Sequence, residues 1–355
     1  MFNKGNITFV LPGRNRSGGV RVTVEMANRL IDIGYEVRIA YRAKKRFTAV
    51  WARSIIENVW LGINGYDHTD WTDEYKGKLE KYIDLQSLVF SEKEIVIAVG
   101  MHTIKDVYSL NADVIKIRYN HGFSLGVEEL TNSAWGLPMP TIVVASTLIP
   151  RMEKLSGQKA RAVIPNGINT TEYFIENGST RDGIGIMYSS HPNKEPKDII
   201  KLAQRIEAKW ACVPQYYYGT DEMPKALRTG IYKRFPSVEQ ARKIYNRCMV
   251  WLSVSREEGF CLPILEAMAC GCVVISSDNL GAKELIRNGE NGYLVPTGDI
   301  DSFLVRVEQV LNNTELREYI VQKGLETVKA FSWETAVAKM DSFLNDIRNS
   351  YDAIR

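Results

Sequence analysis

One stretch of the sequence, residues 249–276, constrains the fold more than any other. It begins with an apolar run, Met249–Val254, which indicates a buried strand, and a polar loop follows. Pro263 stands where a helix would begin, and Gly271 is placed to end that helix after about two turns. A second short apolar strand, Cys272–Ser276, completes the pattern. The stretch therefore predicts a strand–helix–strand unit with a short helix, as found in parallel α/β sheets.

Two carboxylates flank the start of this helix, Glu258 on the loop and Glu266 on the helix. Helical side chains lean toward the N-terminus, so we expect Glu266 to point at the loop that carries Glu258. In open α/β sheets, ligands bind at the carboxyl ends of the strands, which is where this loop lies. Backbone amides at the start of a helix favour a phosphate, and carboxylates accept hydrogen bonds from a diol. The pair thus indicates a sugar nucleotide, although two acids that merely cap a helix start are an equally good interpretation of an isolated pair.

The neighbouring residues favour the functional interpretation. The segment Glu-Gly-Phe-Cys-Leu-Pro-Ile-Leu-Glu-Ala-Met-Ala-Cys-Gly, residues 258–271, resembles the E-x7-E segment of glycosyltransferase family 4, and residues 277–296 continue the likeness. These are retaining enzymes of GT-B fold, so the resemblance implies an α/β protein with two Rossmann-like domains facing a central cleft. It also implies that Glu266 binds the ribose hydroxyls and that Glu258 contacts the donor sugar. The donor is further expected to meet the loop residues before the helix: Gly259, Phe260, Cys261 and Leu262.

The N-terminal part opens in a Rossmann-like manner, with a strand Asn6–Leu11, a glycine-bearing loop and a helix Val20–Ile33. The loop is neither a G-x-G-x-x-G nor a Walker sequence, which argues against a dinucleotide dehydrogenase and a P-loop ATPase. Gly18 and Gly19 would let a phosphate or sugar approach the backbone closely. A plain tight turn is the alternative. The sequence Ser-Gly-Gly-Val-Arg is similar to the family's Gly-Gly loop, which faces donor and acceptor.

A histidine ends one of the other predicted strands of the first domain. Val114–Tyr119 is expected to form that strand, and His121 and Gly122 follow it. A lone histidine is more often structural than catalytic. The family carries a His-Gly near the donor sugar, so the resemblance implies that His121 contacts the donor sugar or the acceptor.

The diphosphate site departs from the family pattern. Members usually carry Gly-Arg-Leu and then Lys-Gly where this chain has residues 191–197, and the arginine and lysine hold the diphosphate. Lys194 fits the lysine best, with Lys197 as the alternative. Ser190 or His191 stands in the arginine region, and an acid replaces the glycine. The sequence does not identify the side chain that replaces the arginine.

The resemblance and the predicted elements together suggest three segments. They are an N-terminal acceptor-side domain (1–168), a C-terminal nucleotide-sugar domain (169–330) and a terminal helix that returns to the first domain (331–355). Further strands are predicted at Glu94–Val99, Thr141–Ser146, Ile184–Ser189 and Trp210–Tyr218. Residues 42–53 mix cations with aromatic side chains; a solvated loop is the favoured interpretation, and contact with an anionic membrane or a lipid-linked acceptor is the alternative.

Composition excludes several classes of protein. The chain has 355 residues, of which 45% are hydrophobic and 25% charged, as in ordinary globular proteins of two domains. A net charge of +3 is too mild to indicate nucleic acid binding. Five cysteines without metal-type spacing indicate buried thiols in a reducing compartment. No signal peptide or membrane span is evident, so we expect a cytoplasmic protein, compatible with a place at the inner face of the membrane.

The resemblance implies a retaining, metal-independent glycosyltransferase without a cofactor. Its donor would be a UDP-, dTDP- or GDP-linked sugar, and its acceptor a glycan, a lipid-linked saccharide or another hydroxyl compound, in cell-surface polysaccharide or glycoconjugate synthesis. Lys194, Glu258 and His121 are the candidate catalytic residues, with Lys194 stabilising the leaving phosphate. Two alternatives remain open, namely a sugar-nucleotide epimerase of GT-B fold and a non-catalytic GT-B partner subunit.

Overall fold

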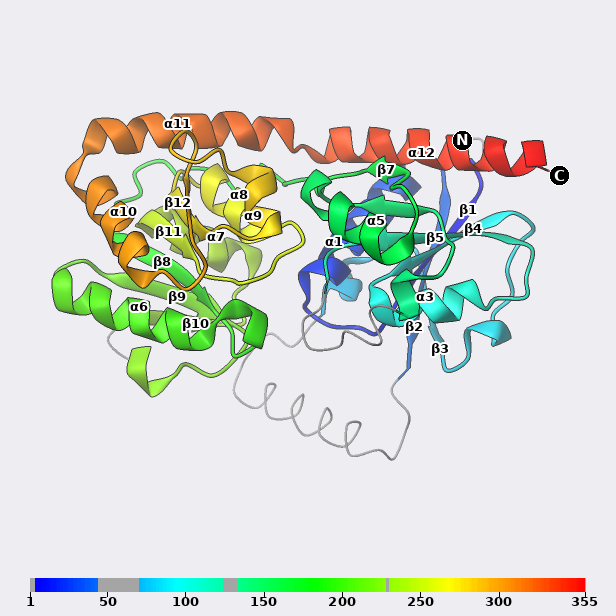
Figure 1. The fold of residues 1–355 in the computed structure, drawn as a ribbon, viewed down its shortest axis with the longest axis horizontal. Helices are drawn as coiled ribbons and strands as arrows, with labels where there is room; N and C mark the ends of the chain where they lie inside the picture. Colours follow the sequence, from blue (N-terminus) through cyan, green and yellow to red (C-terminus); the bar gives the residue numbers. More distant parts are fainter. Residues whose placement is uncertain (1–3, 44–69, 124–132, 228–229, 355) are drawn as a thin grey trace. The chain divides into compact units, whose positions relative to one another are not determined.

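The computed structural model describes residues 4–43, 70–123, 133–227 and 230–354. The chain divides into two compact units, each with its own sheet (Figure 1). Unit 1 comprises Met1–Asn166 and Trp333–Arg355, and unit 2 comprises Gly167–Ser332. The sequence prediction put these two boundaries at residues 168 and 330.

Unit 1 is organised on a parallel sheet of seven strands in the order β3-β2-β1-β4-β5-β6-β7. Its strands are β1 (Asn6–Leu11), β2 (Glu36–Arg42), β3 (Lys78–Tyr82), β4 (Glu94–Val99), β5 (Val114–Asn120), β6 (Thr141–Val143) and β7 (Ala162–Val163). Its described helices are α1 (Gly18–Asp32), α3 (Met101–Tyr108), α5 (Ile149–Ser156) and α12 (Trp333–Ile354), with 3₁₀ turns η1 (Trp71–Glu74), η2 (Leu85–Ser87) and η3 (Ser146–Leu148).

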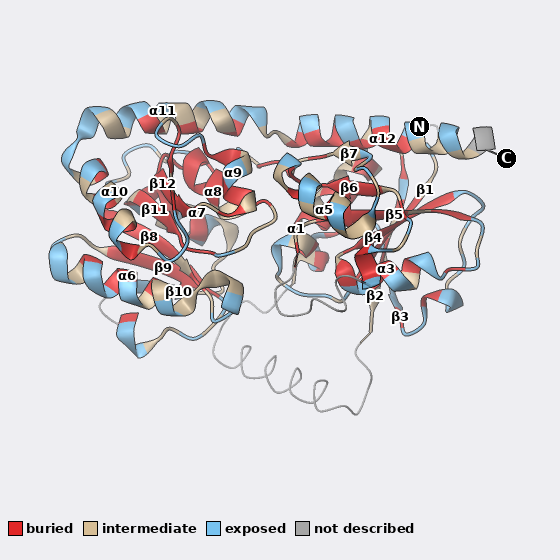
Figure 2. Cartoon of the chain, in the orientation of Figure 1, coloured by how far each residue is buried: buried red, intermediate tan, exposed pale blue. Residues whose placement is uncertain are grey.

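The central strands of unit 1 are buried along almost their whole length, as Figure 2 shows in red. Every residue of β4 is buried, and in β1 only the first residue is partly exposed. Strands covered on both faces read as continuous apolar runs. This is why the sequence predicts these two strands with the bounds that the structure has.

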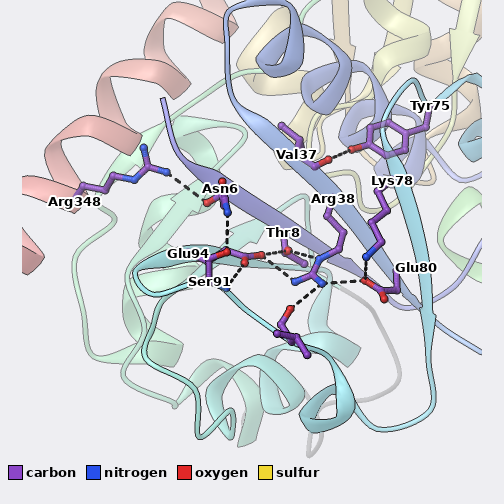
Figure 3. Close-up of polar contacts among 11 residues, drawn as sticks. Asn6, Thr8, Val37, Arg38, Tyr75, Lys78, Glu80, Ser91, Glu94 and Arg348 are labelled. Carbon is purple, nitrogen blue, oxygen red and sulfur yellow. Dashed lines mark hydrogen bonds and ion pairs between the residues drawn. The ribbon is translucent and has the colours of Figure 1, made fainter. Parts of the chain in front are cut away.

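A polar network ties four strands of unit 1 together at the edge where they begin (Figure 3). Arg38 on β2 donates to Thr8 on β1 (2.9 Å) and to Glu94 on β4 (3.0 Å). The same guanidinium donates to Glu80 on β3 (2.9 Å). Thr8 is fully buried and Glu94 nearly so, so the arginine offsets a carboxylate that would be costly to bury alone. The network lies at the opposite end of β1 from the glycine loop, which marks it as structural.

The C-terminal helix α12 packs against unit 1. Tyr35 donates its hydroxyl to Asp341 (2.7 Å), and Lys4 pairs with the same carboxylate (3.1 Å). At the start of the helix, the guanidinium of Arg29 lies 4.7 Å from the ring centre of Trp333. Trp333 is buried, as are Met340 and Leu344 on the same helix, so the last segment of the chain contributes to the core of unit 1.

Unit 2 is organised on a second parallel sheet, of order β10-β9-β8-β11-β12-β13. Its strands are β8 (Gly183–Tyr188), β9 (Gln215–Gly219), β10 (Ile231–Arg234), β11 (Cys248–Ser253), β12 (Val273–Ser277) and β13 (Tyr293–Val295). Its helices are α6 (Pro196–Lys209), α7 (Val238–Arg247), α8 (Leu262–Ala269), α9 (Leu280–Leu285), α10 (Ile300–Asn312) and α11 (Thr314–Ala330), with 3₁₀ turns η4 (Pro192–Lys194) and η5 (Lys225–Leu227).

The two faces of this sheet bury different side chains. Strand residues alternate between faces, so Val250 and Leu252 of β11 join the aliphatic core under α6 and α10. Trp251 points to the opposite face, where it packs on Tyr218 and on Tyr245 of α7. A Cβ at Gly185 on the neighbouring strand β8 would overlap the Trp251 ring. The aromatic face therefore depends on a glycine beside the tryptophan.

Several predicted strands are displaced by one residue, and two differ from the structure by more than that. The strand predicted at Trp210–Tyr218 begins only at Gln215, because Trp210 terminates α6 and donates its N–H to Ile206. The strand predicted at Thr141–Ser146 ends at Val143, and a 3₁₀ turn follows.

Other sequence predictions concern the surface and the thiols. Most of the basic and aromatic segment 42–53 lies outside the described residues. Within the parts of the chain that are described, no helix is both long and apolar enough to cross a bilayer. Four cysteines are buried and Cys212 is exposed, so the expectation of buried thiols is wrong for that one position.

Candidate functional site

Two loops meet at the carboxyl edge of the unit 2 sheet. One follows β8 and the other follows β11, and these strands are parallel neighbours, so both loops leave the sheet at the same edge. The backbone N–H of Arg256 donates to the carbonyl of Asn193 (2.8 Å). The Arg256 side chain pairs with Glu195, and Lys194 pairs with Glu258. One backbone and two side-chain contacts thus fix the loops to each other.

The Lys194–Glu258 ion pair is the central feature of this edge. The lysine and glutamate side chains keep 23% and 15% of their exposure, so the pair is shielded but still reaches solvent. Burial disfavours the ammonium, but the Glu258 carboxylate more than offsets this, and the pKa of Lys194 is raised above its ordinary value. Lys194 therefore carries a full positive charge at neutral pH, available to an anion that displaces Glu258.

A small cavity lies beside the ion pair. Its volume is about 10 Å³, and Lys194, Glu258, Trp251, Cys261 and Pro263 are among the residues that line it. That is roughly the space of one water molecule. A larger ligand at this place must therefore displace side chains of the wall, such as Lys194 and Glu258.

The start of α8 is shaped by an unusual backbone conformation. Cys261 precedes the helix with a φ of 66°, in the left-handed region that non-glycine residues rarely adopt. Its carbonyl accepts the N–H of Ile264 (3.0 Å), and Pro263 occupies the first turn without requiring a partner for an N–H. Strain of this kind is common at binding sites, and here it fixes the direction in which the loop enters the helix.

A third loop, which follows β12, packs against the loop that follows β11. Asn279 caps α9 with its side-chain oxygen and donates its amide to the carbonyl of Ser255 (2.9 Å). Gly281 donates its N–H to the carbonyl of Glu258 (2.9 Å). A Cβ at Gly281 would lie 2.8 Å from the backbone nitrogen of Phe260, which real structures do not tolerate. Gly281 therefore permits the close approach that holds the Glu258 loop.

Glu266 lies on the aromatic face of the sheet. It is 5% exposed, and its Oε2 accepts the hydroxyl of Tyr245 (2.8 Å). Tyr245 in turn contacts the hydroxyl of Tyr218 (2.6 Å). Trp251 stacks on Tyr218 and also lines the cavity beside Lys194, so one ring connects the surroundings of Glu266 with those of the ion pair.

The predicted site residues thus fall into two groups. Those of unit 2 lie on the three connected loops or on the helices α6 and α8: Lys194, Lys197, Glu258, Gly259, Phe260, Cys261, Leu262 and Glu266. The structure brings Lys194 and Glu258 together, whereas Lys197 is exposed in the first turn of α6. The remaining three, Gly18, Gly19 and His121, belong to unit 1.

The unit 1 residues lie after β1 and β5, at the carboxyl ends of these strands. Gly18 and Gly19 open α1, and Ser17 caps it by accepting the N–H of Val20 (3.5 Å). His121 has a buried Nε2 without a hydrogen-bond partner in the described structure. Burial lowers the pKa of His121 to about 4, so the ring is neutral at physiological pH. Most buried polar side-chain atoms have a hydrogen-bond partner, so this ring nitrogen is one of few exceptions among the described residues.

Sequence reasoning missed three residues of this region. Arg256 is exposed beside Lys194, and it supplies a guanidinium near the place where the family's arginine is absent. Tyr218 and Tyr245 contact Glu266 only through the tertiary fold, because 21 positions separate Tyr245 from Glu266 along the chain. The sequence gives one indication of the position of Tyr218: residues of a strand alternate between its faces, so Tyr217 and Tyr218 of β9 lie on opposite faces of the sheet.

Part of the sequence that forms this site is similar to a known protein family. Residues 230–327 match the family model described as Glycosyl transferases group 1. This segment contains β11, α8, Glu258 and Glu266. Residues 230–327 are thus similar to the group 1 glycosyl transferases.

Curated relatives match this chain over part of their length. EpsD of Bacillus subtilis (strain 168) is 28% identical over 205 residues, which are 54% of this chain and 53% of EpsD. CapM of Staphylococcus aureus, a capsular polysaccharide biosynthesis glycosyltransferase, is 32% identical over 107 residues, which are 29% of this chain and 28% of CapM. The chain thus spans about half of the first relative (53%) and less of the second.

Solved structures match over nearly the whole chain. Anabaena HepE, crystallised in complex with UDP, matches with a TM-score of 0.74 at 14% identity, covering 96% of this chain and 100% of that one. At this identity the likeness shows the fold alone. It confirms the predicted GT-B fold, built from two Rossmann-like α/β units.

Proposed function

We propose that this protein is a group 1 glycosyl transferase that moves a sugar from a nucleotide-diphosphate sugar to a hydroxyl acceptor, with retention of anomeric configuration and without a metal ion. The observation that carries the proposal is the Lys194–Glu258 ion pair at the carboxyl edge of the unit 2 sheet, with Glu266 on the following helix. A displaceable cation beside two carboxylates suits a ligand that combines phosphates with hydroxyl groups.

In this proposal the nucleotide lies along the start of α8. Glu266 accepts hydrogen bonds from the ribose hydroxyls, and Lys194 moves from Glu258 to the diphosphate. Backbone amides of the loop Gly259–Leu262 face the phosphates, as helix N-termini do in other anion sites. Arg256 is the candidate for the missing arginine, and Lys197 is a second cation near the same loop. UDP, dTDP and GDP all fit this chemistry, and HepE provides an example of the same fold with UDP.

The reaction needs stabilisation of a leaving group more than it needs a strong base. The bond between the anomeric carbon and the β-phosphate oxygen breaks, and the electron pair leaves with the nucleoside diphosphate. The acceptor oxygen then bonds to the anomeric carbon on the same face, and its proton goes to the departing phosphate. Lys194 stabilises the charge that develops on that phosphate, which is commonly the largest catalytic contribution. Glu258, released from Lys194, holds a hydroxyl group of the donor sugar.

We assign the acceptor side to unit 1. Gly18 and Gly19 leave room for a ligand at the start of α1, since a Cβ at either position meets no described atom within 4 Å. His121 is neutral, and its Nε2 has no partner among the described residues, so it offers a hydrogen bond to the donor sugar or the acceptor. A glycan or lipid-linked acceptor in cell-surface polysaccharide synthesis agrees with the similarity to CapM, a capsular polysaccharide biosynthesis glycosyltransferase.

A binding and transfer assay tests the proposal. The protein is incubated with UDP-, dTDP- and GDP-sugars, and thermal shift, calorimetry and release of nucleoside diphosphate are measured. We expect one nucleotide class to raise the melting temperature and one sugar nucleotide to be cleaved. Binding without any release would indicate a non-catalytic partner subunit, and conversion of the sugar without release would indicate an epimerase. Absence of binding to all three classes would refute the proposal.

A single substitution tests the assignment of Glu266. Glu266→Ala removes the acceptor for the ribose hydroxyls, so we expect the affinity for the nucleotide to fall at least about tenfold. Glu315→Ala on α11 is the matched control, because Glu315 is an exposed glutamate of the same unit. Unchanged affinity in the Glu266 variant would contradict the assignment.

A further inference from the structure

Two buried tyrosines stand directly behind Glu266. Tyr245 on α7 places its hydroxyl 2.8 Å from the Glu266 Oε2, and the hydroxyl of Tyr218, on β9, lies 2.6 Å from that of Tyr245. Tyr245 is fully buried, and Tyr218 and Glu266 are 8% and 5% exposed. The three side chains thus form a continuous hydrogen-bonded chain away from solvent.

The direction of this chain follows from proton counting. Each phenol has one proton, and the carboxylate can only accept, so Tyr245 donates to Glu266. Tyr245 then has no proton left for its other neighbour, so Tyr218 must donate to Tyr245. Burial and, after it, the charge of Glu266 hold the pKa of both phenols well above the ordinary value. Both tyrosines therefore remain protonated donors at neutral pH.

The rings that carry these hydroxyls are packed on several sides. Tyr218 stacks on Trp251 with ring centres 5.5 Å apart and an interplanar angle of 23°. Tyr245 packs against Trp251 at 4.4 Å and against Tyr173 at 6.1 Å. Rings enclosed in this way cannot turn without disturbing their neighbours, so the Tyr245 hydroxyl is held in one place.

A carboxylate fixed at one oxygen cannot rotate freely about its last side-chain bond. A carboxylate has roughly four acceptor positions, so it can accept the hydroxyl of Tyr245 and hydrogen bonds from a ligand as well. Without the tyrosine, several rotamers of Glu266 would have to be frozen when a diol binds, at a cost in affinity. The hydroxyl of Tyr245 therefore acts on the ligand only through Glu266.

We propose that Tyr245, supported by Tyr218, is a positioning residue that orients Glu266 toward the ribose hydroxyls of a nucleoside diphosphate. The inference rests on the proposed function, because it takes the ribose as the ligand of Glu266. It assigns to the aromatic face of unit 2 a part in recognising the sugar hydroxyls of the nucleotide, of which UDP and GDP offer two and dTDP one. It also explains why a polar chain is kept inside a face that is otherwise filled with rings.

The test measures whether the Tyr245 hydroxyl and the ribose hydroxyls act together. Calorimetry gives the dissociation constants of UDP and GDP, and of their 2′-deoxy and 3′-deoxy counterparts, for the wild-type protein and for Tyr245→Phe. The matched control is Tyr217→Phe, which removes an equally buried hydroxyl from the same strand as Tyr218; that hydroxyl bonds to Gln215 (2.5 Å) and belongs to the opposite face.

We expect the wild-type protein and the control to lose about tenfold in affinity when the critical ribose hydroxyl is absent. Tyr245→Phe should bind the ribonucleotide about tenfold more weakly, yet lose less than about threefold on removal of the ribose hydroxyl. Tyr218→Phe should show the same pattern more weakly, and it also provides the answer if Tyr245→Phe does not fold. A merely structural tyrosine would weaken all ligands equally.

Each outcome bears on a different statement. If the wild-type protein discriminates ribonucleotides but the two tyrosine variants discriminate as well as it does, the positioning role is refuted and the proposed function stands. If the wild-type protein binds no nucleotide, the proposed function and the positioning role are both refuted. Loss of discrimination in the Tyr217→Phe control would likewise refute the role, since it would show that any buried hydroxyl of this unit has the same effect.

Discussion

Lys194 and Glu258 form an ion pair across two loops that follow neighbouring parallel strands. In the proposed reaction each of them has another partner, the diphosphate for the lysine and the donor sugar for the glutamate. The two partners belong to one ligand, so its binding would exchange one shielded ion pair for two new contacts. A nucleotide alone offers only the phosphates, and would leave Glu258 without its cation.

The lysine can be tested by comparing a nucleotide with its nucleoside. Lys194→Met keeps the length of the side chain but removes the charge, so we expect the affinity for UDP or GDP to fall about tenfold to a hundredfold. The affinity for uridine or guanosine should change little, because these ligands lack phosphates. Lys209→Met is the control, since Lys209 pairs with Glu308 on the exposed side of the same unit. A similar loss for nucleoside and nucleotide would contradict the role of Lys194.

Buried central strands and the turns next to them are the elements that the sequence predicts best. The run Met249–Val254 and the turn at Gly271 are local signals, and the structure has β11 at Cys248–Ser253 and a φ of 77° at Gly271. Edge strands carry weaker signals, because they are half exposed and mix charges with apolar residues. This is why β3 (Lys78–Tyr82) and β10 (Ile231–Arg234) cannot be recognised in the sequence.

Some residues of the candidate site can be predicted from a local sequence pattern, and others cannot. Glu258 and Glu266 are eight positions apart on one loop and the helix that follows it, so a local sequence pattern predicts both. The partners of these acids come from distant segments: Lys194 precedes Glu258 by 64 positions, and Tyr245 precedes Glu266 by 21. Such contacts depend on strand order and on the face that each side chain occupies. A single sequence does not carry this information.

Gly281 gives a prediction about stability. The methyl group of Gly281→Ala would lie 2.8 Å from the nitrogen and 2.9 Å from the carbonyl carbon of Phe260, so the loop has to shift. We expect the free energy of unfolding to fall by about 2 kcal/mol, as measured by urea denaturation of unit 2 signals. Gly324→Ala is the control, because the added methyl group would meet Met268 at an ordinary 3.4 Å. Equal stability of both variants would show that the loops are not closely packed.

Gly19 gives the opposite prediction, a loss of function without a loss of stability. A Cβ at Gly19 meets no described atom within 4 Å, and its φ is not in the left-handed region. Gly19→Ala should therefore leave stability unchanged or raise it by about 0.5 kcal/mol, because alanine restricts the unfolded chain. If a ligand approaches this backbone, the added methyl group should lower the rate of sugar transfer about tenfold. Full activity of this stable variant would exclude a ligand at the loop.

The five cysteines provide a check of the packing of unit 2. Cys212 is exposed, whereas Cys248, Cys261, Cys270 and Cys272 are buried. Burial raises the pKa of each buried thiol, so these cysteines are both inaccessible and protonated. A thiol reagent at pH 8 should label one cysteine rapidly, and Cys212→Ser should abolish that rapid phase. Rapid labelling of several thiols would contradict the buried α8 and β12.

His121 makes the stability of unit 1 depend on pH. Burial lowers the pKa of this ring from 6.5 to about 4, so below pH 6.5 the unfolded chain binds a proton that the folded chain excludes. Stability should therefore rise with pH between 4 and 6.5, and acidification across this window should cost up to about 3 kcal/mol from His121 alone. Other acids titrate in the same range, so the difference between the wild-type protein and His121→Gln isolates this contribution. Urea denaturation at several pH values, with hydrogen exchange of β5 as a local probe, should show a flatter profile for His121→Gln. His102→Gln, which replaces an exposed histidine of the same unit, should retain the wild-type profile; equal slopes in all three proteins would mean that His121 is not buried in its neutral form.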